Sequence, residues 1–157
     1  MQDITTRSDV LRVEKVDKTF HGGVVALQGL SLDVRTGDFI SLLGPSGCGK
    51  STALRLIAGL LSPTNGRITW SGDHGPGDLG VVFQEATLMP WATVAQNVWL
   101  PFRLRGMTYN SVKDEVLEAL RLVGLEKLQN SYPRELSGGM KMRVSIARAM
   151  VTRPRLI

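Results

Sequence analysis

Residues 44–51 have the types and spacing with the clearest chemistry in this sequence. They read GPSGCGKS and fit the pattern G-x-x-x-x-G-K-[ST], between a short apolar stretch and a segment with helical spacing. Small residues let successive backbone N–H groups turn inward around phosphate oxygens, and a helix start adds partial positive charge. Lys50 can place its ammonium on the β- and γ-phosphates of a nucleotide, and the Ser51 hydroxyl can ligate Mg²⁺.

This segment, called the phosphate loop below, therefore predicts a nucleotide site. The alternative is a glycine-rich turn, but a chance match to the pattern is expected in only about 1% of chains of this composition. Cys48 is better explained as a small loop residue than as a nucleophile. The residues that this pattern places at the phosphates are Gly44, Pro45, Ser46, Gly47, Cys48, Gly49, Lys50 and Ser51.

A second glycine turn, called the signature turn below, spans residues 136–140 with the sequence LSGGM. Taken alone, a serine and two glycines before a helix are most simply a capping turn. The same residues also leave a hydroxyl and glycine N–H groups at a helix start, where anions bind. One nucleotide needs only one phosphate cradle, so a second one in the same chain needs an explanation.

Composition narrows the class of protein. The chain has 157 residues, 43% of them hydrophobic and 21% charged, with a net charge of +5 and one cysteine. No apolar run approaches the roughly 18 residues that span a bilayer, and the N-terminus does not have the pattern of a signal peptide. These features predict a soluble protein of a reducing cytoplasm. Because the basic residues are scattered, the positive charge does not predict nucleic-acid binding.

The phosphate loop needs a strand before it and a helix after it, and the sequence predicts both. Apolar and polar residues alternate in the first part of the chain, which favours antiparallel strands separated by glycine turns. The expected strands cover residues 11–16, 24–27, 30–34, 39–43, 67–70 and 79–83, the expected turns lie at Gly22–Gly23 and Gly29, and the expected helix covers residues 51–61.

The second half of the chain changes to helical spacing. Thr93 can cap one helix, Asn110 or Ser111 can open another, and Ser137 can open a third that runs to about Thr152. The fold class predicted is therefore α/β: a core around the phosphate loop with an N-terminal antiparallel β subdomain and an inserted helical subdomain. The expected divisions are residues 11–84 for the β subdomain and loop core, 85–135 for the helices and 136–157 for the return to the core.

Together these residues resemble a known family. The phosphate loop, Gln84 after an apolar stretch, and the signature turn followed by a basic helix are similar to the nucleotide-binding domain of ABC transporters, a type of P-loop NTPase. The resemblance runs from about Leu11 to Ile157. Met140 stands where the family most often has Gln, and with residues 84–91 (QEATLMPW) this resembles the nitrate, sulfonate and taurine importer ATPases.

The resemblance explains why one chain has two anion-binding turns. In this family two copies pair head to tail, and the signature turn of one copy caps the ATP held by the other. Ser137, Gly138 and Gly139 are thereby implied to contact the partner's nucleotide. Gln84 is implied to sense Mg²⁺ and the attacking water, although an isolated glutamine at a strand end is usually only a polar residue.

Three further residues have roles only through the resemblance. Thr52 is expected at the α-phosphate. Phe20 stands where the family places an aromatic ring on adenine, with a hairpin core residue as the equal alternative. Trp91 is expected in a groove for a membrane subunit, or in ordinary subdomain packing.

The family's acidic strand end, which binds Mg²⁺ and polarises water, and its later histidine are expected after Ile157. The chain is therefore interpreted as C-terminally incomplete. The whole protein is expected to be an ATPase at the cytoplasmic face of the membrane, with ATP and Mg²⁺ as cofactors. Its expected partners are a second ATPase subunit, permease subunits and indirectly a solute-binding protein, with a small anion such as nitrate, sulfonate or taurine as cargo. The alternatives are a nucleotide-binding fragment without hydrolytic activity, or a non-transport ABC ATPase.

Overall fold

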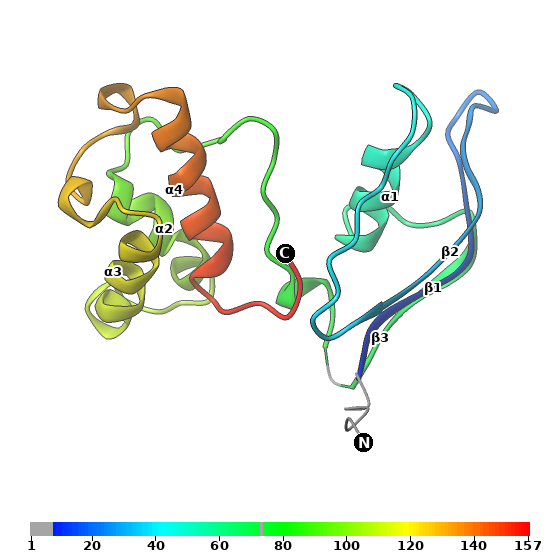
Figure 1. Cartoon of the computed structure of the whole chain (residues 1–157), viewed down its shortest axis with the longest axis horizontal. Coiled ribbons are helices and arrows are strands. Elements are labelled where there is room, and N and C mark those ends of the chain that lie inside the picture. The colour runs from blue at the N-terminus through cyan, green and yellow to red at the C-terminus, as the bar shows by residue number, and fades with distance from the viewer. Residues whose placement is uncertain (1–7, 73) are drawn as a thin grey trace, which may run out of the picture. The chain divides into compact units, whose positions relative to one another are not determined.

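The computed structural model describes residues 8–72 and 74–157, and these form two compact units. The first unit ends at Asp78 and the second begins at Leu79. Figure 1 shows β-strands and one α-helix in the first part of the chain, and further α-helices in the second. The division places the phosphate loop in the first unit and both Gln84 and the signature turn in the second.

The first unit contains a three-stranded antiparallel sheet in the order β2-β1-β3. Its elements are β1 (Asp9–Thr19), β2 (Val25–Arg35), α1 (Lys50–Ile57), β3 (Asn65–Trp70) and a short 3-10 helix (Pro76–Asp78). Alternation predicted this sheet, and the central strand β1 buries Leu11, Val13 and Val16. The glycine turn at Gly22–Gly23 is confirmed, since the Phe20 N–H donates to the Val24 carbonyl across it at 2.9 Å.

The predicted turn at Gly29 is wrong, because Gly29 lies inside the continuous strand β2. The register between β1 and β2 shifts at this point, from Val16 opposite Leu30 to Lys18 opposite Leu27. Gly29 takes φ 64°, and its N–H donates to an Asp17 carboxylate oxygen at 2.6 Å. Glycine therefore allows a bulge here. The Asp17 carboxylate accepts the hydrogen bond from the Gly29 N–H in place of a backbone carbonyl of β1.

The apolar segment before the phosphate loop was predicted as a strand, and that prediction is also wrong. Residues 39–43 form no regular strand, and the side chains of Phe39 and Leu43 are 95% and 90% exposed. A strand is stable only when its N–H and C=O groups pair with a neighbour, and these residues pair with no strand among those the structure describes. Residues 79–83 were also predicted as a strand. They form no regular strand and make one parallel bridge, between Leu79 and Leu156.

The second unit is a helical cluster. Its elements are α2 (Val94–Leu104), α3 (Lys113–Leu122), α4 (Gly138–Met150) and three 3-10 helices (Asn110–Val112, Glu126–Leu128, Pro133–Glu135). The predicted helix starts at Thr93 and Ser137 are confirmed, for α2 and α4 respectively. Thr93 and Gln96 form a reciprocal capping box at α2, and the Ser137 hydroxyl accepts the Met140 N–H at 3.3 Å at α4.

One apolar core joins the three helices. Apolar residues at helical spacing face it, as the sequence predicted for α3, where Val116 and Leu120 are fully buried. The buried members are Val94, Ala95, Val98, Phe102, Val112, Val116, Ala119, Leu120, Leu125, Leu136, Val144, Ala147 and Val151.

Asn97 on α2 is a fully buried polar residue beside this core. Its Oδ1 accepts the Met89 N–H at 2.8 Å, and its Nδ2 donates to the carbonyls of Met89, Ala92 and Thr93 at 3.2, 3.1 and 3.0 Å. One side chain thus satisfies the backbone of the segment that leads into α2.

Asn97→Ala is expected to lower the free energy of unfolding by about 3 kcal/mol, because it leaves several buried backbone groups without a partner. Urea denaturation of the two proteins measures this. Asn130→Ala, at an exposed position, is the control and should change stability by less than about 0.5 kcal/mol. An Asn97 variant as stable as the control would contradict the assignment.

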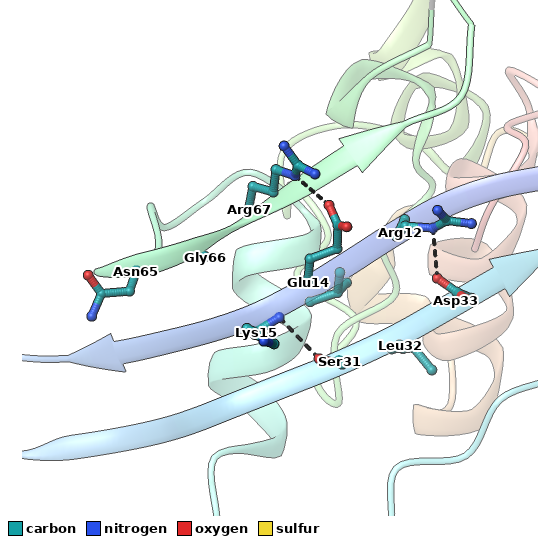
Figure 2. A pocket seen from close by; sticks show the side chains of 10 residues that line it. Arg12, Glu14, Lys15, Ser31, Leu32, Asp33, Asn65, Gly66 and Arg67 are labelled. Atoms are coloured by element: carbon teal, nitrogen blue, oxygen red, sulfur yellow. Dashed lines mark hydrogen bonds and ion pairs between the residues drawn. The ribbon is translucent and has the colours of Figure 1, made fainter.

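The sheet of the first unit has a charged face with an open hollow of about 1090 Å³. Figure 2 shows side chains of neighbouring strands pointing toward one another there: Arg67 of β3 toward Glu14 of β1, and Arg12 of β1 toward Asp33 of β2. The Arg12 Nε donates to the Asp33 carboxylate at 3.0 Å. These charges neutralise one another across strands, so the face stabilises the sheet pairing.

Glu14 and Arg67 give this face a measurable pH response. The hydrogen bond from Arg67, helped by the charges of Arg67 and Arg12, lowers the pKa of Glu14 from its ordinary value of 4.5, against the opposing effect of desolvation. A lowered carboxyl pKa adds stability that is complete above the ordinary value and is lost as pH falls through the lowered one.

Arg67→Met is expected to raise the pKa of Glu14 toward its ordinary value, as measured by an NMR titration of the Glu14 carboxyl carbon. Arg121→Met, an exposed arginine of α3, is the control and should leave that pKa unchanged. A Glu14 pKa that is the same with and without Arg67 would show that the ion pair does not form in solution.

Candidate nucleotide-binding site

The phosphate loop connects irregular backbone to the start of α1, and its glycines allow the connection. Gly49 precedes the helix with φ 93° and ψ 2°, a left-handed conformation that favours glycine. A Cβ at Gly49 would lie 2.7 Å from Leu27 Cδ2 and closer still to the Ala26 carbonyl oxygen. A Cβ at Gly44 would lie 2.7 Å from Cys48 Sγ. Any larger residue at these two places would push the loop away from β2 or open it.

Lys50 is the first residue of α1, and its side chain turns back over the loop. Its Nζ donates to the carbonyls of Gly44 at 2.8 Å and Pro45 at 2.7 Å. It also lies 3.5 Å from Cys48 Sγ. One ammonium therefore closes the loop on itself, and the only charged side chain of the loop lies inside its curve.

The start of α1 leaves N–H donors for a ligand. The first hydrogen bond of the helix runs from the Ala53 N–H to the Gly49 carbonyl, so the N–H groups of Lys50, Ser51 and Thr52 precede the helical ladder. No side chain caps this end, and its first turn has no acidic residue to neutralise the helix dipole. Ser46, Gly47, Cys48 and Ser51 are exposed around it. Donors, dipole and ammonium together suit an anion such as a nucleotide phosphate.

Phe20 lies in the hairpin between β1 and β2, and its ring is 39% exposed. The Lys18 ammonium lies 5.5 Å from the ring centroid. Its role at adenine and the hairpin-core alternative both stay predictions.

Gln84 belongs to the second unit and is exposed. It lies in irregular backbone rather than at a strand end. Trp91 follows seven residues later with 76% of its surface exposed, so ordinary subdomain packing does not explain it. The role of Gln84 toward Mg²⁺ and water stays a prediction.

The signature turn is also exposed. Ser137 caps α4 through the Met140 N–H, and Gly138 and Gly139 have open space where a Cβ would be. The capping explanation is correct, and the exposed glycine N–H groups still suit the anion-binding role. The predicted site residues therefore form two sets, one on each unit: the phosphate loop with Thr52 and Phe20, and Gln84 with the signature turn.

No group of three or more histidine, cysteine or carboxylate side chains comes together as a metal site within residues 8–72 and 74–157. The predicted ligands of Mg²⁺, Ser51 and Gln84, supply neutral oxygens, which Mg²⁺ accepts when substrate phosphates supply the rest. Arg148, which the sequence analysis did not select, makes a specific contact near Gln84. No sequence signal identifies this residue, because its contact is with backbone about 60 positions earlier in the chain.

Comparisons with known proteins point to one family. A family model described as ABC transporter matches residues 27–157. The nitrate import ATP-binding protein NrtD of Synechocystis sp. is 44% identical over 153 residues, which are 94% of this chain and 58% of that protein. The spermidine/putrescine import ATP-binding protein PotA of Nitrosospira multiformis is 42% identical over 94% of this chain and 42% of that protein.

A solved structure resembles the fold as well. It is a dimeric, post-hydrolysis state of the ATP-binding cassette MJ0796 bound to ADP and Pi. The TM-score is 0.78 at 34% identity, and the match covers 92% of this chain and 70% of that one. Within the described part of the chain, no helix is long and apolar enough to cross a bilayer.

The chain spans a little over half the length of NrtD. The phosphate loop, the helix start behind it and the family model over residues 27–157 lead to one conclusion: the chain belongs to the ABC transporter family.

Proposed function

We propose that this chain is the nucleotide-binding part of an importer ATPase, which hydrolyses ATP to ADP and phosphate and drives uptake of a small solute. The observation that supports this most directly is the Lys50 ammonium, 2.7–2.8 Å from the loop carbonyls of Gly44 and Pro45 at an uncapped helix start. A triphosphate bound there would gain the charge of Lys50 and the N–H groups of α1.

In the proposed mechanism the protein positions and stabilises charge. Lys50 leaves the loop carbonyls for the β- and γ-phosphate oxygens, where it offsets the charge that develops as water attacks. Ser51 and Gln84 would hold Mg²⁺, which would supply positive charge to offset the charge of the phosphates. Thr52 would contact the α-phosphate, and Phe20 would stack on adenine.

The proposed assembly is a head-to-tail pair of ATPase subunits attached to permease subunits at the cytoplasmic face of the membrane. The signature turn supports this, because Ser137, Gly138 and Gly139 are exposed at the start of α4. The MJ0796 cassette is dimeric in the solved structure that this chain resembles. Exposed Trp91 is the residue proposed to meet the permease.

The proposed cargo is a small anion, as the resemblance to nitrate importers suggests. PotA, a spermidine/putrescine importer subunit, is almost as similar to this chain. Since nitrate and spermidine carry opposite charges, similarity to the ATPase subunits of both importers does not identify the cargo. We therefore infer that the permease and solute-binding protein select the solute.

A second function is proposed for residues 1–157 alone: a nucleotide-binding module without turnover. The observation that favours it is coverage, because this chain spans only 58% of the length of NrtD. In the family the residues that bind Mg²⁺ and polarise water stand on an acidic strand end, and this chain has no match for it. A non-transport ABC ATPase is less favoured, because NrtD and PotA both belong to importers.

Lys50→Ala in the complete ATPase is expected to lower kcat by at least about 100-fold, because the γ-phosphate loses its main counter-charge. Phosphate release in the presence of Mg²⁺ and ATP measures this. Lys113→Ala is the matched control, since Lys113 is exposed and is the first residue of α3, as Lys50 is the first residue of α1. Near-normal hydrolysis by the Lys50 variant would refute the proposed site.

Residues 1–157, purified alone, are expected to release no phosphate from ATP above the spontaneous rate. The same phosphate assay, with the complete ATPase as the positive control, checks it. A robust Mg²⁺-dependent rate from this chain alone would contradict the second function and would require a water-activating group among these residues.

A further inference from the structure

Arg148, near the end of α4, reaches the segment that follows Gln84. Its guanidinium donates to the Thr87 carbonyl at 3.0 Å, the Ala86 carbonyl at 3.1 Å and the Thr87 hydroxyl at 3.2 Å. A fourth contact, 3.4 Å long, runs to Ser145 on the same helix. Three acceptors therefore lie on a loop more than 60 positions earlier in the chain.

The contact lies partly out of water, because Arg148 is partly buried and Ser145 beside it is fully buried. Desolvation lowers the pKa of Arg148 from its ordinary value. Moving a charged group out of water is unfavourable unless its donors find partners. The planar fork of arginine matches two neighbouring carbonyls, which the single ammonium of lysine cannot do.

The loop is held in a conformation that it would not adopt freely. Thr87 has φ 44°, which is unusual for a β-branched residue. Arg148 bonds the carbonyls on both sides of this residue's N–Cα bond, which stabilises the left-handed turn. Asn97 fixes the next part of the loop through Met89 and Ala92. The backbone from Ala86 to Ala92 is thereby tied at both ends.

The same helix connects this loop to the signature turn. Arg148 lies eleven residues after Ser137, which is about 16 Å along an α-helix. Since α4 is continuous from Gly138 to Met150, its two ends move together. Gln84 lies only two residues before Ala86.

We propose that Arg148 is a positioning residue, which ties the Gln84 segment to α4 so that Gln84 keeps its place relative to the signature turn. It rests on the proposed function, because Gln84 and the signature turn matter only if ATP binds. Arg148 itself touches neither nucleotide nor Mg²⁺ in this proposal.

The test replaces Arg148 by Lys, which keeps the charge and removes the fork. In the complete ATPase, Arg148→Lys is expected to lower kcat about tenfold, with the KM for ATP changed less than about twofold. Backbone ¹⁵N order parameters of Ala86 and Thr87 are expected to fall from about 0.85 to below about 0.6. Arg143→Lys is the matched control, because Arg143 on the same helix donates to the Val123 carbonyl at 2.9 Å. It should leave both quantities unchanged.

A second, milder variant tests the same contact in case Arg148→Lys does not fold. Thr87→Val keeps the β-branched shape and removes one acceptor, so kcat should fall about threefold and the double variant should be no worse than Arg148→Lys alone. Unchanged order parameters in Arg148→Lys, or equal losses in Arg143→Lys, would overturn the proposal. If the unmodified complete ATPase does not hydrolyse ATP, the proposed function fails, and the order parameters still decide whether Arg148 holds the loop.

Discussion

The contact of the Lys50 ammonium with the carbonyls of Gly44 and Pro45 is the interaction on which the proposed chemistry depends. It keeps a positive charge inside a curved backbone at the start of α1. Gly49 permits the curve, because no other residue fits between the loop and β2. In the proposed function, a phosphate would replace the carbonyls as the partner of Lys50.

In the second unit, as in the phosphate loop, polar side chains hold irregular backbone by donating hydrogen bonds to its carbonyls. Two buried or partly buried polar side chains, Asn97 and Arg148, hold the irregular backbone before α2 by bonding its carbonyls. Where irregular backbone is buried beside an apolar core, its polar groups need such partners in place of water. The Gln84 segment is therefore ordered by side chains of α2 and α4, and only its exposed residues remain for ligands or partners.

The sequence predicted those parts of the structure that depend on local interactions. The cap residues Thr93 and Ser137 act within one helical turn, so both helix starts are where the sequence places them. The strand at residues 39–43 depends on neighbours far along the chain, and apolar character alone does not make a strand. The contact of Arg148 with Thr87 spans 61 positions, and no spacing rule reports a contact of that kind.

The central claim is that the backbone N–H groups from Ser46 to Thr52 bind nucleotide phosphates. An NMR titration of the ¹⁵N-labelled chain with ADP and Mg²⁺ tests it most directly. The account predicts that the largest amide shift changes fall on these seven residues. Changes confined to the charged face of the sheet, or absent at millimolar ADP, would contradict it.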